Sequence, residues 1–252
     1  MQTMMIYSES GGATKSTTAV SLAMVAAEEG RRVILIDLDP RGATTKWLDA
    51  QPVDVGLDVG AILGNADPRG WADELAVPSP FHSNLRVIPS DRSVSARETD
   101  DPGEVGHRLA DSLEDVPADL AIIDCPNRQG GSLIYNALTA AESVIYAATP
   151  TADGVDGFIG AQESVRRYND LSDRAAVEEA GIIVGGYKET ITPREATHSI
   201  EQMRETGLLL TPLVPHRTIV GEVRYSHDWY GNFRKGAPVA AAYRELARKV
   251  IR

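Results

Sequence analysis

Several features that would each indicate a class of protein are scarce or absent in this chain. Its single cysteine, Cys125, rules out an internal disulfide framework and disfavours a thiolate metal site. No run of 18 or more apolar residues occurs, and the start shows no basic region followed by a short apolar stretch. Neither a membrane span nor a secretory signal is therefore expected. Together these absences predict a cytoplasmic protein.

Positive charge is also in short supply. The 25 lysines and arginines are outnumbered by 36 aspartates and glutamates, and the resulting formal charge of −11 opposes approach to a polyanion. The bases are unevenly spread, because the region from Arg217 onward holds eight of them against three acids. A local basic surface explains this distribution, and so does a solvated C-terminal helix with scattered bases.

The chain has enough length and apolar content for a sizeable core, with 252 residues of which 42% are hydrophobic. Short aliphatic or β-branched runs alternate with longer amphipathic stretches, as in a parallel sheet covered by helices. Strands are predicted at 3–7, 33–37, 85–89, 119–123, 143–148, 181–187 and 208–214. Helices are predicted at 15–29, 105–114, 132–141, 154–169, 194–206 and 238–251. Prolines and glycines make 50–82 an irregular excursion. Residues 1–252 are thus predicted to form a single α/β domain with a doubly wound, mostly parallel sheet flanked by helices.

A glycine-rich segment joins the first predicted strand to the first predicted helix, and residues 10–18 read Ser-Gly-Gly-Ala-Thr-Lys-Ser-Thr-Thr. A helix that opens on Lys15 and Ser16 after such a loop brings backbone N–H groups, a helix N-terminus and an ammonium group to one point, which suits nucleotide phosphates. The usual GxxxxGK[ST] pattern has glycine where this chain has Glu9 and Thr14. An ordinary glycine-rich turn is the alternative for this segment taken alone.

Carboxylates follow two other predicted strands, at the edge of the sheet where doubly wound folds bind ligands. Asp37 and Asp39 end the second strand, and four apolar residues close on Asp124 in an arrangement that resembles a Walker B segment, whose carboxylate holds Mg²⁺. Taken singly, each acid also suits a helix cap or a turn. With Lys15 and Ser16 they supply the positioning and charge neutralisation that phosphoryl transfer needs. The set predicts a P-loop NTPase fold that binds a nucleoside triphosphate.

Four motifs, in their order and spacing, resemble those of the ParA/MinD-type deviant Walker ATPases, and among them the ParA-like plasmid and chromosome partition proteins. They are Gly-Gly-Ala-Thr-Lys-Ser-Thr-Thr-Ala at 11–19, Val-Ile-Leu-Ile-Asp-Leu-Asp-Pro-Arg-Gly at 33–42, Ile-Ile-Asp-Cys-Pro at 122–126 and Asn-Ala-Leu-Thr-Ala-Ala-Glu at 136–142. The resemblance runs through most of the chain. Because the P-loop begins almost at residue 1, small ParA proteins without an N-terminal DNA-binding domain are the most similar type.

The resemblance implies that ATP and Mg²⁺ bind here, and it gives the loop residues their roles. Lys15 would contact the β- and γ-phosphates, Ser16 would ligate Mg²⁺, and Thr17 would help to cradle the α-phosphate. The residues that would supply backbone donors are Gly11, Gly12, Ala13 and Thr14.

The same resemblance assigns roles outside the loop. Asp39 would position or activate the attacking water, and with Lys15 it would form the catalytic pair. Asp37 and Asp124 would support Mg²⁺ and the lysine. Pro215, after the last predicted strand, would lie by the adenine.

Two departures from the family pattern bear on activity. Ser10 stands where a signature lysine reaches the nucleotide of the opposite subunit in the family's ATP-sandwich dimer. Losing a cation at the phosphates costs about 10³-fold or more in rate, by analogy with arginine fingers. The open outcomes are slow hydrolysis, replacement by Arg41 or Arg128, or assembly with very weak turnover. The second departure is Thr14, which is strained if its position requires a positive φ and mild if it is helical.

The resemblance predicts an ATP-dependent partition ATPase. It would form a homodimer on ATP-Mg²⁺ binding, associate with the nucleoid through non-specific DNA binding, and be stimulated by a ParB-like centromere-binding protein. Clustered cations suffice for such DNA binding, and the candidates are Arg217, Arg224, Arg234 and Lys235. The alternatives are a weakly hydrolysing dimerisation switch, a MinD-like membrane-cycling ATPase and a P-loop kinase or ligase. The thin apolar face of the C-terminal helix disfavours the membrane alternative.

Overall fold

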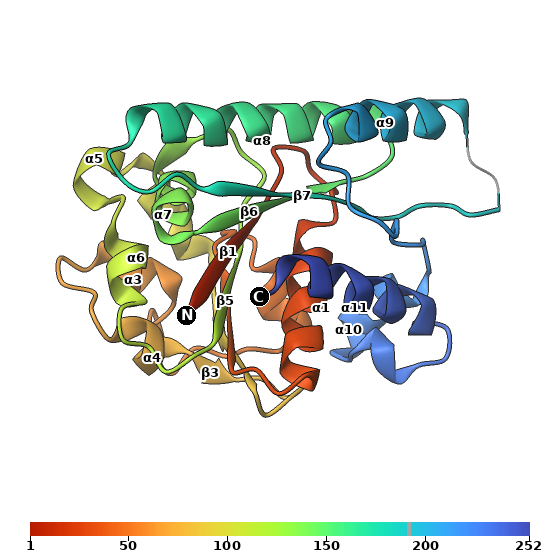
Figure 1. Ribbon diagram of the computed structural model, residues 1–252. Coiled ribbons are helices and arrows are strands. Elements are labelled where there is room, and N and C mark those ends of the chain that lie inside the picture. The colour runs from red at the N-terminus through yellow and green to blue at the C-terminus, as the bar shows by residue number, and fades with distance from the viewer. Residues whose placement is uncertain (191–192) are drawn as a thin grey trace.

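The computed structural model describes residues 1–190 and 193–252, and within them a seven-stranded sheet forms the centre of the molecule (Figure 1). The strands are β1 (Gln2–Tyr7), β2 (Val33–Asp37), β3 (Val77–Pro78), β4 (Leu85–Ile88), β5 (Leu120–Asp124), β6 (Ser143–Ala148) and β7 (Glu178–Val184). Their order across the sheet is β3-β4-β2-β5-β1-β6-β7. All neighbours pair in parallel except β3, which runs antiparallel to β4. The predicted doubly wound, mostly parallel sheet is confirmed.

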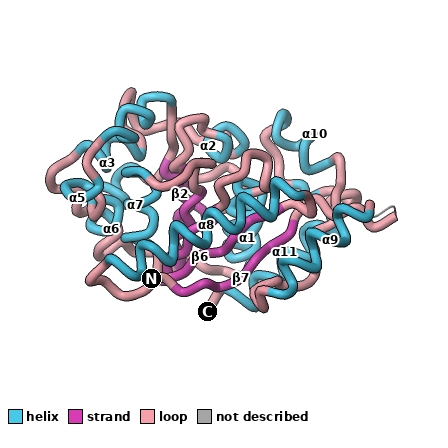
Figure 2. Tube along the Cα trace, turned by 90° about the horizontal axis from the view of Figure 1, so that it is seen from above, coloured by secondary structure: helices cyan, strands magenta, loops and turns pink. Residues whose placement is uncertain are grey.

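Helices cover both faces of this sheet (Figures 1 and 2). The α-helices are α1 (Lys15–Glu28), α2 (Ala43–Trp47), α3 (Val59–Gly64), α4 (Trp71–Leu75), α5 (Pro102–Val105), α6 (Arg108–Ser112), α7 (Gly131–Ala140), α8 (Ala152–Leu171), α9 (Arg194–Glu205), α10 (Ile219–Ser226) and α11 (Ala237–Val250). Two 3-10 helices are η1 (Arg92–Thr99) and η2 (Tyr230–Asn232).

The central strands are apolar on both faces because a helical layer covers each face. In β1, Met4 and Ile6 point to the core formed with α1, α2, α10 and α11. Met5 and Tyr7 point to the opposite core, formed with α3, α4, α6, α7 and α8. All four side chains are fully buried. Because these strands pair in parallel, their carboxyl ends lie at one edge of the sheet.

The C-terminal helix α11 packs against α1 and belongs to the core. Its apolar residues, including Val239, Tyr243, Leu246 and Val250, are buried there. Its apolar face is therefore covered by protein. Within residues 1–190 and 193–252, no helix is both long and apolar enough to cross a bilayer.

The structure corrects three of the expected elements. The segment 208–214 is no continuous strand. It runs beside β7 with isolated bridges such as Ile182 to Leu209, since Pro212 cannot donate a ladder hydrogen bond. The helix expected at 105–114 is divided into α5 and α6 around Gly106, where a Cβ would lie 2.2 Å from Tyr135. The excursion at 50–82 contains α3, α4 and β3, so it is less irregular than expected.

Candidate functional site

The loop between β1 and α1 takes the shape that its glycines predict. Gly12 adopts a left-handed conformation with φ of 74°, and α1 begins at Lys15. The Lys15 ammonium group turns back over the loop and donates to the carbonyl oxygen of Ser10 at 2.9 Å. Burial lowers the pKa of Lys15, while the nearby Asp124 and Asp39 carboxylates oppose that effect. A cation is thus held at the N-terminus of a helix, where anions bind.

Thr14, directly before this lysine, has a φ of 66° and a ψ of 16°. The strained alternative of the two expected for this position is therefore the one observed, because a β-branched residue is disfavoured in the left-handed region. Its Oγ1 is buried and has no hydrogen-bond partner among the described residues. Gly185, just after β7, packs against it so closely that a Cβ there would lie 2.6 Å from Oγ1.

Two fully buried carboxylates lie side by side beneath the loop. Asp37 and Asp124 are register partners at the ends of β2 and β5. Asp37 accepts from the backbone N–H and the hydroxyl of Thr45, each at 2.8 Å, and from the backbone N–H of Asp39. Burial and the proximity of Asp124 raise the pKa of Asp37. Asp37 therefore braces the turn that carries Asp39 against the start of α2.

The two carboxylate oxygens of Asp124 differ in their hydrogen bonding. Its Oδ2 accepts from Thr44 Oγ1 at 2.7 Å, whereas Oδ1 is buried without a hydrogen-bond partner among the described residues. Burial raises the pKa of Asp124, and the Thr44 and Ser16 hydroxyls and Lys15 offset part of that rise. A buried carboxylate oxygen with no donor beside a serine hydroxyl fits a hard divalent cation such as Mg²⁺ or its water ligand.

Asp39 lies at the end of the same turn and is 7% exposed. It forms an ion pair with Arg41, whose Nη2 lies 2.9 Å from Oδ2, and it accepts from the Arg41 backbone N–H at 2.9 Å. Arg41 also donates to Asn127. The acid expected to position water is thus neutralised by its own neighbour in this structure.

Most of the residues predicted for the site come together around one cavity of about 500 Å³. The predicted residues that line it are Gly12, Ala13, Thr14, Lys15, Ser16, Thr17, Asp39 and Pro215. Gly11 does not line the cavity, and Asp37 and Asp124 lie buried beneath it. Sequence reasoning missed several lining residues from the far side, among them Gly185, Val220 and Tyr243, and it gave Arg217 a role in DNA binding only.

The two arginines considered as replacements for the missing lysine differ in position. Arg41 lines the cavity. Arg128 does not, and its guanidinium pairs with Glu98 of η1 at 2.8 Å. Of the two, the structure brings only Arg41 to the site within this chain.

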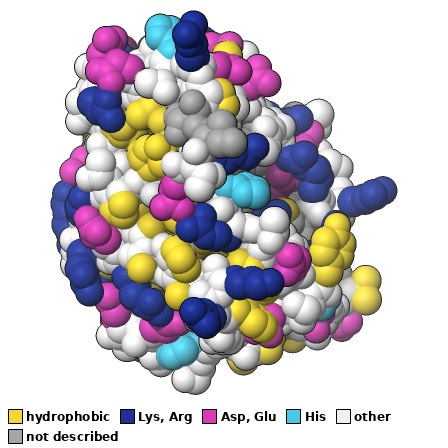
Figure 3. Space-filling model, turned by 90° about the vertical axis from the view of Figure 1, so that its right-hand side faces the viewer, with side chains coloured by type: hydrophobic (Ala, Val, Ile, Leu, Met, Phe, Trp, Pro, Cys, Tyr) yellow, Lys and Arg dark blue, Asp and Glu magenta, His cyan; other side chains and the backbone are white. Residues whose placement is uncertain are grey.

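The four residues considered for DNA contacts also separate. Arg224 Nη2 donates to Thr17 Oγ1 at 2.6 Å, so this exposed side chain also lines the cavity. Arg217 pairs with Glu189 at 2.6 Å. Arg234 and Lys235 are exposed before α11. Figure 3 shows this side of the molecule, where Lys and Arg side chains are numerous but interspersed with acidic and apolar ones.

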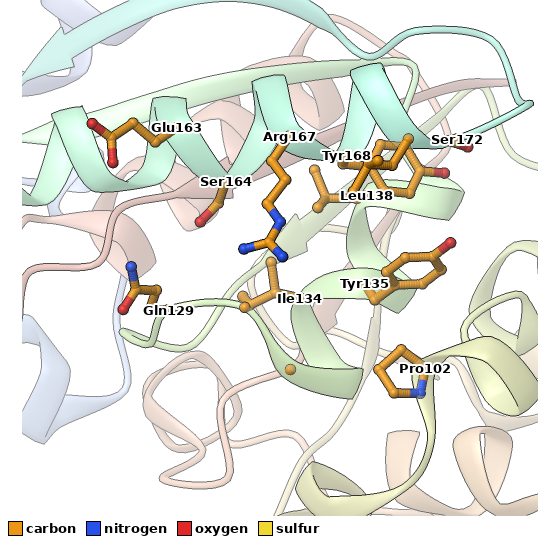
Figure 4. Close-up of a pocket in the computed structure, with 13 residues that line it drawn as sticks. Pro102, Gln129, Ile134, Tyr135, Leu138, Glu163, Ser164, Arg167, Tyr168 and Ser172 are labelled. Carbon is orange, nitrogen blue, oxygen red and sulfur yellow. The ribbon is translucent and has the colours of Figure 1, made fainter.

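A second cavity, of about 430 Å³, lies between α7 and α8 (Figure 4). Tyr135 and Tyr168 meet edge to face on one side of it, and Arg167 points into it from α8. It contains no P-loop residue and neither Asp39 nor Asp124. The residues predicted to contact phosphates therefore line the first cavity and not the second.

The fold and the loop together define a P-loop protein with a deviant Walker motif. The chain belongs to the AAA domain family, whose model (AAA_31) matches residues 1–172. The chromosome partitioning protein ParA of Caulobacter vibrioides is 28% identical over 261 residues, covering 100% of this chain and 94% of that protein. This agrees with the ParA-like resemblance of the motifs.

Solved structures show the same architecture. Apo McdA of Cyanthece superposes with a TM-score of 0.86 at 22% identity, with 100% of each chain covered. Cobyrinic acid a,c-diamide synthase of Mycobacterium smegmatis, solved with an ATP analogue and magnesium, gives a TM-score of 0.76 at 25% identity over 98% of this chain and 93% of that one. The P-loop NTPase fold is thereby confirmed.

Proposed function

We propose that this chain is an ATP-dependent partition ATPase of the ParA type. The observation that carries the proposal is the cavity in which Lys15, Ser16 and Thr17 open a helix beside Asp39, above the buried Asp124. Mg²⁺·ATP would bind there, with Lys15 at the β- and γ-phosphates and Thr17 at the α-phosphate. The ParA relative, matched over almost its whole length, supports partition as the process.

The metal would be held by Ser16 and, directly or through water, by Asp124, with Asp37 as the brace of the adjoining turn. Bound Mg²⁺ would neutralise charge on the phosphates during their transfer. Asp39 would orient the attacking water, which requires its release from Arg41. Pro215, buried at the opposite side of the cavity, would flank the base.

ATP binding would drive homodimer formation, and the dimer would bind DNA without sequence specificity until a ParB-like partner stimulates hydrolysis. Arg234 and Lys235 are exposed candidates for DNA phosphate contacts outside the cavity, and Arg224 is an exposed candidate that also lines it. Arg217 would join them only if it leaves Glu189. The second candidate function is an ATP-controlled dimerisation switch with little turnover. The uncharged Ser10 and the Arg41–Asp39 ion pair favour it.

Steady-state ATP hydrolysis with Mg²⁺, with and without duplex DNA, tests the proposal when combined with light scattering of the same sample. Turnover that rises with DNA, together with ATP-dependent dimers, would support the partition ATPase. Tight ATP binding and dimers without turnover would favour the switch. Absence of nucleotide binding would contradict both. Replacing Arg234 and Lys235 by alanine should weaken DNA binding and flatten its salt dependence while ATP binding stays unchanged.

A further inference from the structure

The first cavity holds four Lys and Arg side chains, and three of them have evident partners. Lys15 donates to the Ser10 carbonyl, Arg41 pairs with Asp39, and Arg217 pairs with Glu189. Arg224, from the last turn of α10, is different. In residues 1–190 and 193–252, no carboxylate lies within ion-pair distance of its guanidinium.

Two contacts fix the position of this guanidinium. Nη2 donates to Thr17 Oγ1 at 2.6 Å, and the group lies over the ring of Trp47 with its central carbon 5.0 Å from the ring centroid. Trp47 is itself 1% exposed, and its Nε1 donates to the carbonyl oxygen of Asp228 at 2.9 Å. The aromatic platform is therefore rigid, and it orients a planar group that has five N–H donors.

The guanidinium of Arg224 keeps its charge in this position. Burial lowers the pKa of Arg224, with Asp124 and Tyr243 opposing the effect, but an arginine stays protonated in proteins. The Arg224 side chain remains accessible to solvent at the open cavity, and among the described residues its guanidinium meets a hydroxyl and an aromatic ring but no carboxylate. An anion that enters the cavity can therefore reach its remaining N–H donors.

We propose that Arg224 binds a phosphate group of the nucleotide, from within the same chain, beside Thr17. The inference rests on the proposed function, since it needs a nucleotide in this cavity. Because Thr17 Oγ1 accepts from Arg224, its own proton is free to donate to the same phosphate. Arg224 would thus supply positive charge in a site that lacks the lysine at position 10, and it would join α10 to the bound ligand.

The test is a titration of the full chain with the fluorescent analogue mant-ADP in the presence of Mg²⁺. Arg224→Gln is compared with wild type and with Arg234→Gln, a matched loss of an exposed arginine outside the cavity. Loss of a charge-assisted hydrogen bond should weaken mant-ADP binding about 10- to 100-fold in Arg224→Gln. Arg234→Gln should bind like wild type, and Arg224→Lys should recover part of the loss.

Competition separates a phosphate contact from a structural role. Inorganic pyrophosphate should displace mant-ADP less well from Arg224→Gln than from wild type, whereas adenosine should compete equally well against both. In the absence of nucleotide, Arg224→Gln should unfold at about the same urea concentration as wild type, because the residue is exposed and has no ion pair within the described chain.

The possible failures are distinguishable. If wild type binds mant-ADP and Arg224→Gln binds it within threefold, the phosphate contact is wrong and the proposed function stands. An equal loss of pyrophosphate and adenosine competition, or a large loss of apo stability, would overturn the contact in favour of a structural role. If wild type binds no nucleotide, both proposals fall.

Discussion

The conformation of Thr14 and its contact with Gly185 give a prediction about stability that needs no ligand. Thr14 holds a left-handed backbone, which costs about 1–2 kcal/mol for a residue with a Cβ. Its buried, unpartnered Oγ1 costs about 1–3 kcal/mol more. Thr14→Gly removes both costs, and it loses about 1 kcal/mol of methyl burial and about 0.5–1 kcal/mol of backbone entropy. The free energy of unfolding should therefore rise by about 2 kcal/mol.

Gly185→Ala should have opposite effects in the two backgrounds. In wild type the new Cβ would meet three Thr14 atoms at 2.6 to 3.0 Å, so overpacking should cost about 1–3 kcal/mol. With Thr14→Gly these atoms are absent. Alanine at 185, where φ is not left-handed, should then be neutral or stabilising by about 0.4–1 kcal/mol. The expected coupling energy between the two sites is about 2 kcal/mol.

Urea unfolding of wild type, Thr14→Gly, Gly185→Ala and the double variant measures this coupling energy. The dependence of the unfolding free energy on urea concentration should be the same for all four proteins. Thr14→Ala is the control, because it removes the hydroxyl and the methyl but keeps a Cβ in the left-handed region. It should be less stable than Thr14→Gly. Additive effects of Thr14→Gly and Gly185→Ala, or a Thr14→Ala variant as stable as Thr14→Gly, would refute the reasoning.

Three further predictions concern charge and ligands. Ser10→Lys should raise ATP turnover by about 10²- to 10³-fold if transfer lacks a cation, with Ser10→Gln as the uncharged control; equal rates for both would contradict this. Hydrogen bonds from the Arg32 guanidinium and backbone N–H lower the pKa of Asp119 to about 2. Because that value lies below the unfolded value near 4, the pair stabilises the fold above about pH 4 and loses this contribution as the pH falls toward 2. The stability difference between wild type and Asp119→Asn should shrink across that window in acid titrations, and a constant difference would count against the pairing. Mg²⁺·ATP at 100 times its Kd should raise the free energy of unfolding by about 2.7 kcal/mol. The Tm should rise accordingly, and EDTA should reduce the increase. A Tm that does not change with nucleotide would argue against the site.

The sheet and its long helices could be predicted from the sequence because their signals are local. Buried parallel strands are continuous apolar runs, and the long helices have amphipathic or apolar stretches bounded by breakers. The edge beyond β7 was mispredicted, since 208–214 is apolar enough for a strand but contains Pro212, which interrupts pairing. Helix α10 was missed because its eight residues give too short a periodic pattern.

The site was predictable to the extent that its residues follow strands or open a helix. Lys15, Asp39 and Asp124 reach one place because parallel strands end at a common edge. The conformation of Thr14 was left open by the sequence, since the residue type alone sets no φ. Its strain depends on the loop as a whole and on Gly185, which is far along the chain and near only in the fold.

The basic side chains near the C-terminus show most clearly why the number of charges in a segment does not predict which residues contact DNA. Arg217 and Arg224 are seven residues apart and look equivalent in the sequence, yet one is paired with Glu189 and the other lies over Trp47 beside Thr17. These partners are contributed by segments far away in the chain, so charge density near the C-terminus could not separate a DNA contact from a cavity cation. A test of DNA contacts outside the cavity therefore begins from Arg234 and Lys235, which precede α11 and are exposed. If replacing these two residues leaves DNA binding unchanged, the acidic net charge indicates that the monomer has no DNA-binding surface of its own. DNA binding would then depend on surfaces created by dimer formation.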